Sequence, residues 1–143
     1  MKQVDIIEPL GSSHPLTDLD GFLEQVKSFP SAYWQEGNGG ALLTLQSIGE
    51  KVSLTLLTNV QNGIYAQFCR ERDNRIIETW LSLGDPERLT ETAEGAEEYF
   101  VSAGLFLQPD QAALCVEDFA KTGDRSSRIQ WISPSEIPPE GNY

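Results

Sequence analysis

The sequence is short of the residues from which reactive and metal sites are built. Its 143 residues include two cysteines and one histidine. Cys69 and Cys115 are too few and too far apart to indicate a disulfide framework or a metal site. A catalytic device of the Ser-His-Asp or Cys-His type would have to use His14, which lies beside a proline in a predicted loop. The sequence therefore predicts no catalytic residue, no metal and no cofactor, and the protein is not expected to be an enzyme.

Basic residues and long apolar runs are also scarce. Ten Lys and Arg residues stand against 22 Asp and Glu, which gives a net charge of −12. Nucleic-acid binding depends on neutralising phosphates, so direct binding of nucleic acid is not expected, and anionic membranes are disfavoured on the same grounds. No apolar run approaches the roughly 18–20 residues of a membrane span. The N-terminus does not resemble a signal peptide, and we expect a cytoplasmic protein.

The length predicts a single domain over residues 1–143. Residues 1–15 are predicted to form an N-terminal strand and loop, and residues 133–143 a C-terminal tail without a role in the core. Between residues 41 and 83, four segments alternate apolar and polar residues and are joined by short, turn-rich connections. This pattern predicts an antiparallel meander with one face on the core. The glycine-rich stretch at 37–40 precedes a strand, which favours a turn over a phosphate-binding loop.

Two segments have the apolar spacing of amphipathic helices. In the first, Leu19, Phe22, Leu23 and Val26 share one face, with Thr17 as the expected N-cap. In the second, Pro109 suits the first turn and Gly123 suits a left-handed C-terminal residue. The sequence thus predicts the α+β class, with an antiparallel meander sheet of about five or six strands and two packed helices.

Candidate binding residues fall in two places. The first is the acidic segment of residues 85–98, which contains a single arginine and would suit a basic partner surface. Its carboxylates are Asp85, Glu87, Glu91, Glu94, Glu97 and Glu98. The second is the aromatic pair Tyr33 and Trp34 before the sheet, because Tyr and Trp are common anchors of protein interfaces. The alternatives are that the acidic segment is only solvated surface, and that the aromatic residues, like Trp80, are packed inside the protein.

The last third of the chain carries a recognisable pattern. It reads P-x-x-A-A-x-x-V-x-x-F-x-x-T-G, then a short polar loop and I-x-W, at Pro109, Ala112, Ala113, Val116, Phe119, Thr122, Gly123, Ile129 and Trp131. This pattern resembles the C-terminal signature of the immunity protein 1 family, found beside bacterial polymorphic toxins. Phe119 and Trp131 are expected to pack the last helix onto the sheet.

The resemblance implies a protein that binds and neutralises a cognate toxin domain by stoichiometric occlusion. Such toxins often act on nucleic acid as deaminases or nucleases, and a toxin of this kind would present a basic active-site surface to an acidic partner. Two alternatives stay open. The chain could be a small enzyme or ligand-binding domain with an acidic pocket, or a structural adaptor with no toxin partner.

Overall fold

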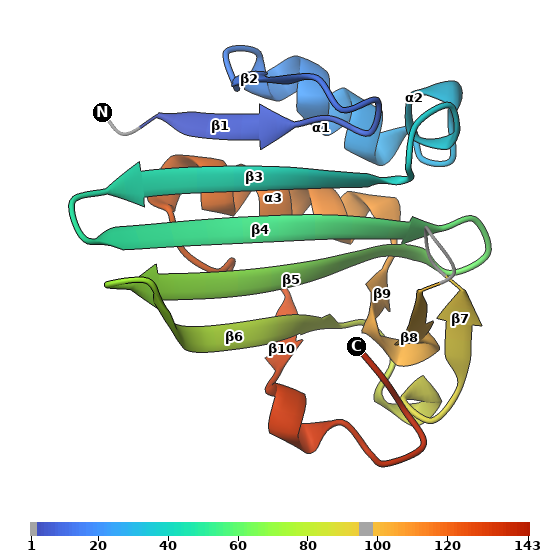
Figure 1. The fold of residues 1–143 in the computed structure, drawn as a ribbon. Coiled ribbons are helices and arrows are strands. Elements are labelled where there is room, and N and C mark those ends of the chain that lie inside the picture. The colour runs from blue at the N-terminus through green and yellow to red at the C-terminus, as the bar shows by residue number, and fades with distance from the viewer. Residues whose placement is uncertain (1–2, 95–98) are drawn as a thin grey trace.

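The computed structural model describes residues 3–94 and 99–143 and has the predicted α+β architecture (Figure 1). In these residues the main sheet is antiparallel and has eight strands. Seven of them run in the order β10 (Gln130–Ile132), β6 (Arg75–Leu83), β5 (Gly63–Arg72), β4 (Glu50–Asn59), β3 (Gly40–Ser47), β1 (Val4–Ile7) and β2 (Ser13–Pro15). The eighth, β9 (Phe106–Leu107), pairs with β5, and β7 (Thr92–Glu94) and β8 (Phe100–Ser102) form a separate ribbon. The sheet is wider than five or six strands because short strands join its edges.

The predicted meander is confirmed, since β3, β4, β5 and β6 pair sequentially and antiparallel. The register aligns Leu43, Leu54, Phe68 and Trp80 in one row across the four strands. The tight β5–β6 turn places Asp73 and Asn74 at positive φ, the conformation that two-residue hairpin turns require. Because successive side chains of a strand point to opposite faces, every second residue of these four strands faces the same side of the sheet.

That face is covered by α3 (Pro109–Thr122), which lies behind the sheet in Figure 1, and by α1 (Leu19–Lys27), which packs against α3 near the β1 edge of the sheet. The apolar stripe of α1 is buried as predicted, with Leu19 half-buried at its start. The predicted N-cap is wrong by one residue: the Asp18 carboxylate accepts a 2.9 Å hydrogen bond from the backbone N–H of Gly21. We call the side chains between sheet and helices the main core.

The end of α3 follows the sequence prediction. Gly123 has a φ of 72° in the left-handed region, and its N–H donates to the carbonyl oxygen of Phe119. Phe119 is buried and its ring meets that of Phe68 edge-on, with centroids 6.2 Å apart. Trp131 is half-buried against the same core, and its indole N–H donates to the carbonyl oxygen of Ser126 over 2.9 Å. Both aromatic residues therefore pack the last helix and strand onto the sheet.

The opposite face of the sheet carries a second, smaller core at one end, and the C-terminal segment helps to close it. Its buried residues are Tyr65, Leu81, Ala93, Val101, Ala103, Leu105, Phe106 and Ile132. Ile137 packs against this second core, and the Asn142 backbone bonds both the N–H and the hydroxyl of Ser102 at 2.9 Å. Residues 133–143 are thus attached to the fold, and the prediction of a tail without a core role is wrong.

Among the described residues, no helix is long and apolar enough to cross a membrane.

Candidate functional site

A hollow of about 950 Å³ lies where three segments that are distant in sequence meet. They are residues 34–39, which include the end of α2 (Ala32–Gln35); residues 58–62, at the turn between β4 and β5; and residues 88–94, which lead from η1 (Pro86–Arg88) into β7. In Figure 1, α2, the β4–β5 turn and β7 all lie at the same end of the sheet. The structure therefore brings the loop predicted as one binding region close to the acidic segment predicted as the other.

Carboxamides dominate the polar lining of the hollow. They are Gln35, Asn38, Asn59, Gln61 and Asn62. A carboxamide both donates and accepts hydrogen bonds. Some of these groups bind the backbone of the lining segments themselves. The Asn38 side-chain oxygen accepts from the N–H of Gly40 at 2.9 Å, and the Asn59 side-chain oxygen accepts from the N–H of Asn62 at 2.9 Å. The remaining carboxamide donors and acceptors are suited to binding an extended polypeptide, whose backbone also alternates donors and acceptors.

Arg88 is the basic residue in the described lining, and it is already engaged. Its Nη2 donates to the Asn62 side-chain oxygen at 3.0 Å, and its Nε lies 3.4 Å from a Glu91 carboxylate oxygen. The side chain of Asn59 in turn donates to the main-chain oxygen of Glu94 at 2.7 Å. These contacts fix the acidic segment against the β4–β5 turn. The wall of the hollow that carries Glu91 and Glu94 is therefore held in place by hydrogen bonds from side-chain amides and to main-chain oxygens.

Four of the six predicted acidic contact residues are described, and all four are exposed: Asp85, Glu87, Glu91 and Glu94. Asp85 has a local role as well, because its carboxylate accepts from the N–H of Glu87 at the start of η1. Glu91 and Glu94 line the hollow. Glu97 and Glu98 lie outside the described residues.

Trp34 is fully buried, so its prediction as an exposed anchor is wrong and the alternative, that it packs inside the protein, is correct. Its ring lies against those of Phe22, Phe29 and Tyr33, and its indole N–H donates to the carbonyl oxygen of Gln25 at 2.8 Å. Trp34 still lines the inner wall of the hollow. Tyr33 is half-buried, and its hydroxyl is turned away to another partner, the Glu8 carboxylate.

Glu8 joins Tyr33 to the single histidine. One Glu8 oxygen accepts from the Tyr33 hydroxyl at 2.8 Å, and the other lies 2.7 Å from Nε2 of His14. The Nδ1 of His14 lies 2.8 Å from the carbonyl oxygen of Pro15. Both ring nitrogens thus face acceptors, which suits the protonated imidazolium. The hydrogen bond to Glu8 raises the pKa of His14 and lowers that of Glu8. His14 could act as a general base only by giving up one of these hydrogen bonds.

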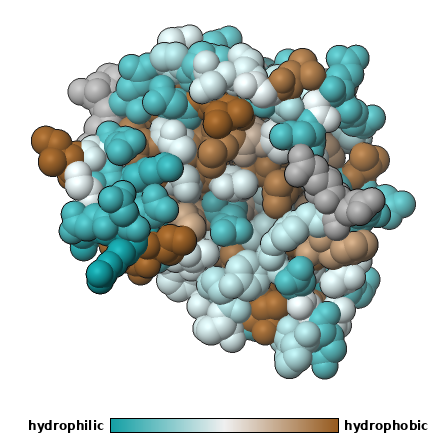
Figure 2. All heavy atoms as spheres, viewed as in Figure 1, coloured by the Kyte–Doolittle hydropathy of each residue, from teal (hydrophilic) through white to brown (hydrophobic). Residues whose placement is uncertain are grey.

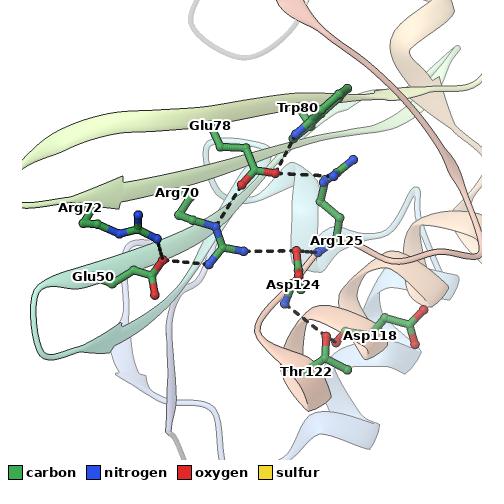
Figure 3. A network of polar contacts seen from close by, with 9 residues as sticks. All are labelled: Glu50, Arg70, Arg72, Glu78, Trp80, Asp118, Thr122, Asp124 and Arg125. Carbon is green, nitrogen blue, oxygen red and sulfur yellow. Dashed lines mark hydrogen bonds and ion pairs between the residues drawn. The ribbon is translucent and has the colours of Figure 1, made fainter.

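Figure 3 shows a second polar network, which no pattern in the sequence predicts. Arg70 donates to Glu50 and Glu78 at 3.0 Å each and lies 3.3 Å from Asp124. Three segments therefore meet at one guanidinium: the start of β4, the middle of β6 and the loop after α3. Periodicity places Arg70 on the helix-facing side of β5, but no local signal indicates its three partners.

Trp80 lies in the same network. The Arg125 guanidinium carbon lies 4.2 Å from the centre of the Trp80 ring, and the indole N–H donates to Glu78 at 2.8 Å. A guanidinium over an indole face is a favourable cation–π contact. Trp80 is therefore half-buried against the main core and covered by the loop after α3.

The described residues contain no group of three or more His, Cys, Asp or Glu side chains arranged to hold a metal ion. Cys115 is buried in the main core, where burial raises the pKa of its thiol. Cys69 is half-buried, and its sulfur lies 3.4 Å from the hydroxyl of Thr79. Both cysteines are free thiols.

Comparison with known proteins gives no relative: no protein-family model, no curated protein and no solved structure matches this chain.

Proposed function

We propose that this protein is an immunity protein that binds a cognate bacterial toxin domain in the cytoplasm and neutralises it by stoichiometric occlusion. The C-terminal pattern that ends at Trp131 suggests the class. The observation that supports it most is the hollow beside the exposed carboxylates of Glu91 and Glu94. A toxin domain that acts on nucleic acid has a basic cleft, and an acidic surface at this hollow would cover that cleft.

The charge balance adds a kinetic argument. With a net charge of −12, the chain attracts a basic partner over a distance of about 10 Å at 0.1 M salt. Electrostatic attraction of this kind raises association rates well above the unsteered range of about 10⁵–10⁶ M⁻¹s⁻¹. The carboxamides of the hollow would then bind the main chain of an inserted segment. Charge thus governs how quickly the partner arrives, and the amides govern how it is held.

The test needs a candidate toxin domain, which is sought among the genes that neighbour the gene of this protein and is then purified. Titration of the toxin with this protein should abolish toxin activity at a 1:1 ratio. Association should slow steeply as salt is added, and a variant with Glu87→Gln, Glu91→Gln and Glu94→Gln should associate more slowly, with a flatter salt dependence. Activity that persists at a large excess of this protein would refute the proposal.

A matched control removes the same charge elsewhere. Asp20, Glu24 and Asp110 are exposed acidic residues of α1 and α3. Changing them to Asn, Gln and Asn lowers the net charge by the same amount but leaves the hollow intact. If this control loses as much association rate as the first variant, the acidic segment does not direct binding and only the overall charge matters.

A ligand-binding domain is the second candidate, because the volume of the hollow also lies within the range of small-molecule sites. A small ligand would be held by the carboxamides around Asn59 and Asn62, without a requirement for the exposed carboxylates. Isothermal titration with short peptides and with small polar metabolites separates the two functions. Binding of a metabolite that survives the triple Gln substitution would favour this candidate.

A further inference from the structure

The ribbon of β7 and β8 has two outer edges, and among the described residues only the edge of β8 is covered by main chain. There the N–H of Ser102 donates to the Asn142 carbonyl oxygen at 2.9 Å, and the Asn142 side-chain amide donates to the carbonyl oxygen of Phe100 at 2.7 Å. The C-terminal segment thus takes the place of a third strand. The outer edge of β7 faces the hollow instead, because all three residues of β7 line it and no described residue of β8 does.

The pairing register shows which main-chain groups of β7 point outward. In an antiparallel ladder, residue pairs that exchange hydrogen bonds alternate with pairs that do not. The main-chain groups of Ser102 and Phe100 point to the C-terminal segment. Those of their register partners, Thr92 and Glu94, therefore point away from β8. Glu94 agrees with this, because its carbonyl oxygen accepts from the side-chain amide of Asn59 at the β4–β5 turn.

The main chain of Thr92 is the free part of this edge. Thr92 is exposed, and neither its N–H nor its carbonyl oxygen has a hydrogen-bond partner in the part of the chain that the structure describes. The other walls of the hollow carry the carboxamides of Gln35, Asn38 and Gln61. Figure 2, in the same view as Figure 1, shows hydrophilic and hydrophobic residues side by side at this end of the molecule, on the right. A free strand edge is a template for another strand, and here it borders a hollow of mixed polarity.

We propose that the hollow receives an extended segment of the partner, which adds a strand to the free edge of β7 through the main chain of Thr92. The inference rests on the proposed function for the identity of the partner and states how that partner is held. In strand addition, main-chain hydrogen bonds provide affinity and side chains provide specificity. Glu91 and Glu94 are exposed beside Thr92 and line the same hollow. The added segment therefore carries a lysine or arginine that these carboxylates bind.

A second open strand edge is less suited to a basic segment. β10 pairs with β6 only at Leu81–Leu83, so in the described part of the chain β6 has no strand on this side over residues 75–80. That stretch begins with the exposed Arg75. It contains one carboxylate, Glu78, which is already paired with Arg125 at 3.5 Å. A basic segment is therefore better matched at β7.

The experiment changes Thr92 in the full chain and measures binding to a purified candidate toxin domain that the unmodified protein neutralises. Thr92→Pro removes the outward N–H, a change that a strand edge facing solvent tolerates. We expect dissociation about tenfold faster, with the salt dependence of association unchanged because every carboxylate is kept. Thr92→Val keeps the N–H and removes only the hydroxyl, so it should dissociate like the parent. Circular dichroism and urea denaturation check that both variants fold.

Hydrogen exchange tests the unmodified protein and decides the matter if Thr92→Pro does not fold. The amide of Thr92 should exchange about tenfold more slowly in the complex than in the free protein, whereas the amide of Ala93, which faces β8, should be protected in both. Three results would each overturn strand addition and leave the proposed function intact: parent-like dissociation of a folded Thr92→Pro, an equal loss in Thr92→Val, or unchanged exchange at Thr92. If the unmodified protein neutralises no candidate toxin, both proposals fail.

Discussion

The side-chain amide of Asn59 donates a hydrogen bond to the main-chain oxygen of Glu94, 35 residues further along the chain. The oxygen of the same amide accepts from the backbone N–H groups of Gln61 and Asn62 at 3.0 and 2.9 Å. One side chain therefore shapes the β4–β5 turn and also attaches the acidic segment to it. The two functions use different atoms, so they can be separated by substitution.

Asn59→Asp should keep the turn and lose the attachment. A carboxylate still accepts from the N–H groups of Gln61 and Asn62, but it cannot donate to Glu94 and repels its carbonyl oxygen. We expect a loss of about 1 kcal/mol in the free energy of unfolding, measured by urea denaturation. Asn59→Ala, which removes both sets of contacts, should cost about 1 kcal/mol more. Equal stability of Asn59→Asp and the parent would show that the attachment contributes nothing.

Arg70→Met should destabilise the protein by about 2–3 kcal/mol. The arginine side chain is 19% exposed, and its removal leaves Glu50, Glu78 and Asp124 without their shared cation. Urea denaturation at pH 7 measures the change. Lowering the pH should reduce the difference between variant and parent, because protonation relieves the repulsion between the remaining carboxylates.

Arg72→Met is the matched control for that prediction. Arg72 is 59% exposed, and its guanidinium lies 3.4 Å from a Glu50 carboxylate oxygen. Exposed ion pairs contribute little, so a change below about 1 kcal/mol is expected. A similar loss in both variants would mean that the Arg70 network acts no differently from an ordinary surface ion pair.

The His14–Glu8 pair should make stability depend on pH. The pKa of His14 is raised above its ordinary value of 6.5, so its contribution is fully present below pH 6.5 and is lost as pH rises through the raised pKa. The pKa of Glu8 is lowered from 4.5, so its contribution is lost only as pH falls through that lowered value. The pair should therefore stabilise the fold most between about pH 5 and 6.5.

The single histidine makes this prediction easy to check. An NMR titration of its one imidazole should give a midpoint above 6.5, and Glu8→Gln should bring the midpoint back toward the ordinary value. The difference in stability between the parent and His14→Gln should shrink from pH 6 to pH 8.5. A midpoint at or below 6.5 in the parent would contradict the geometry of the two acceptors.

Phe119 and Trp131 should both prove structural. Phe119→Ala creates a cavity in the main core and should cost about 3–5 kcal/mol, whereas the half-buried Trp131 should cost less on truncation to alanine, about 2–4 kcal/mol. Thermal denaturation measures both changes. If Trp131→Ala melted like the parent but failed to bind the toxin, Trp131 would be a contact residue.

Much of the fold follows from local pattern. Alternation in residues 41–83 and the stripes of two helices were sufficient to predict the meander, α1 and α3, because burial on one face imposes a period that the sequence displays. The predicted N-cap of α1 is one residue away from the observed one, because Thr17 and Asp18 are both good capping residues. Only the backbone conformation at the start of the helix decides which of the two caps it. The strands β2 and β7 have three residues each, too few to display a period.

The site was predicted only in part, for a related reason. The acidic segment is obvious from composition, but its meeting with Asn59 and Asn62 depends on contacts between residues far apart in sequence. The burial of Trp34 likewise depends on Phe22 and Phe29, which approach it only once α1 and α2 are packed. The C-terminal segment, rich in proline, has the composition of a tail, and its partner Ser102 lies 40 residues away from Asn142.

Strand β5 has neighbours along both of its edges. Along one edge it pairs with β4 over its whole length; along the other it pairs with β9 at Ile64 and Tyr65 and with β6 from Gln67 onward. Its amide hydrogens can therefore reach solvent only when one of these strand pairs separates. Because the two cores lie on opposite sides of this strand, such an opening disrupts both. In native-state hydrogen exchange, the amides of β5 should be the slowest in the chain, exchanging only by global unfolding.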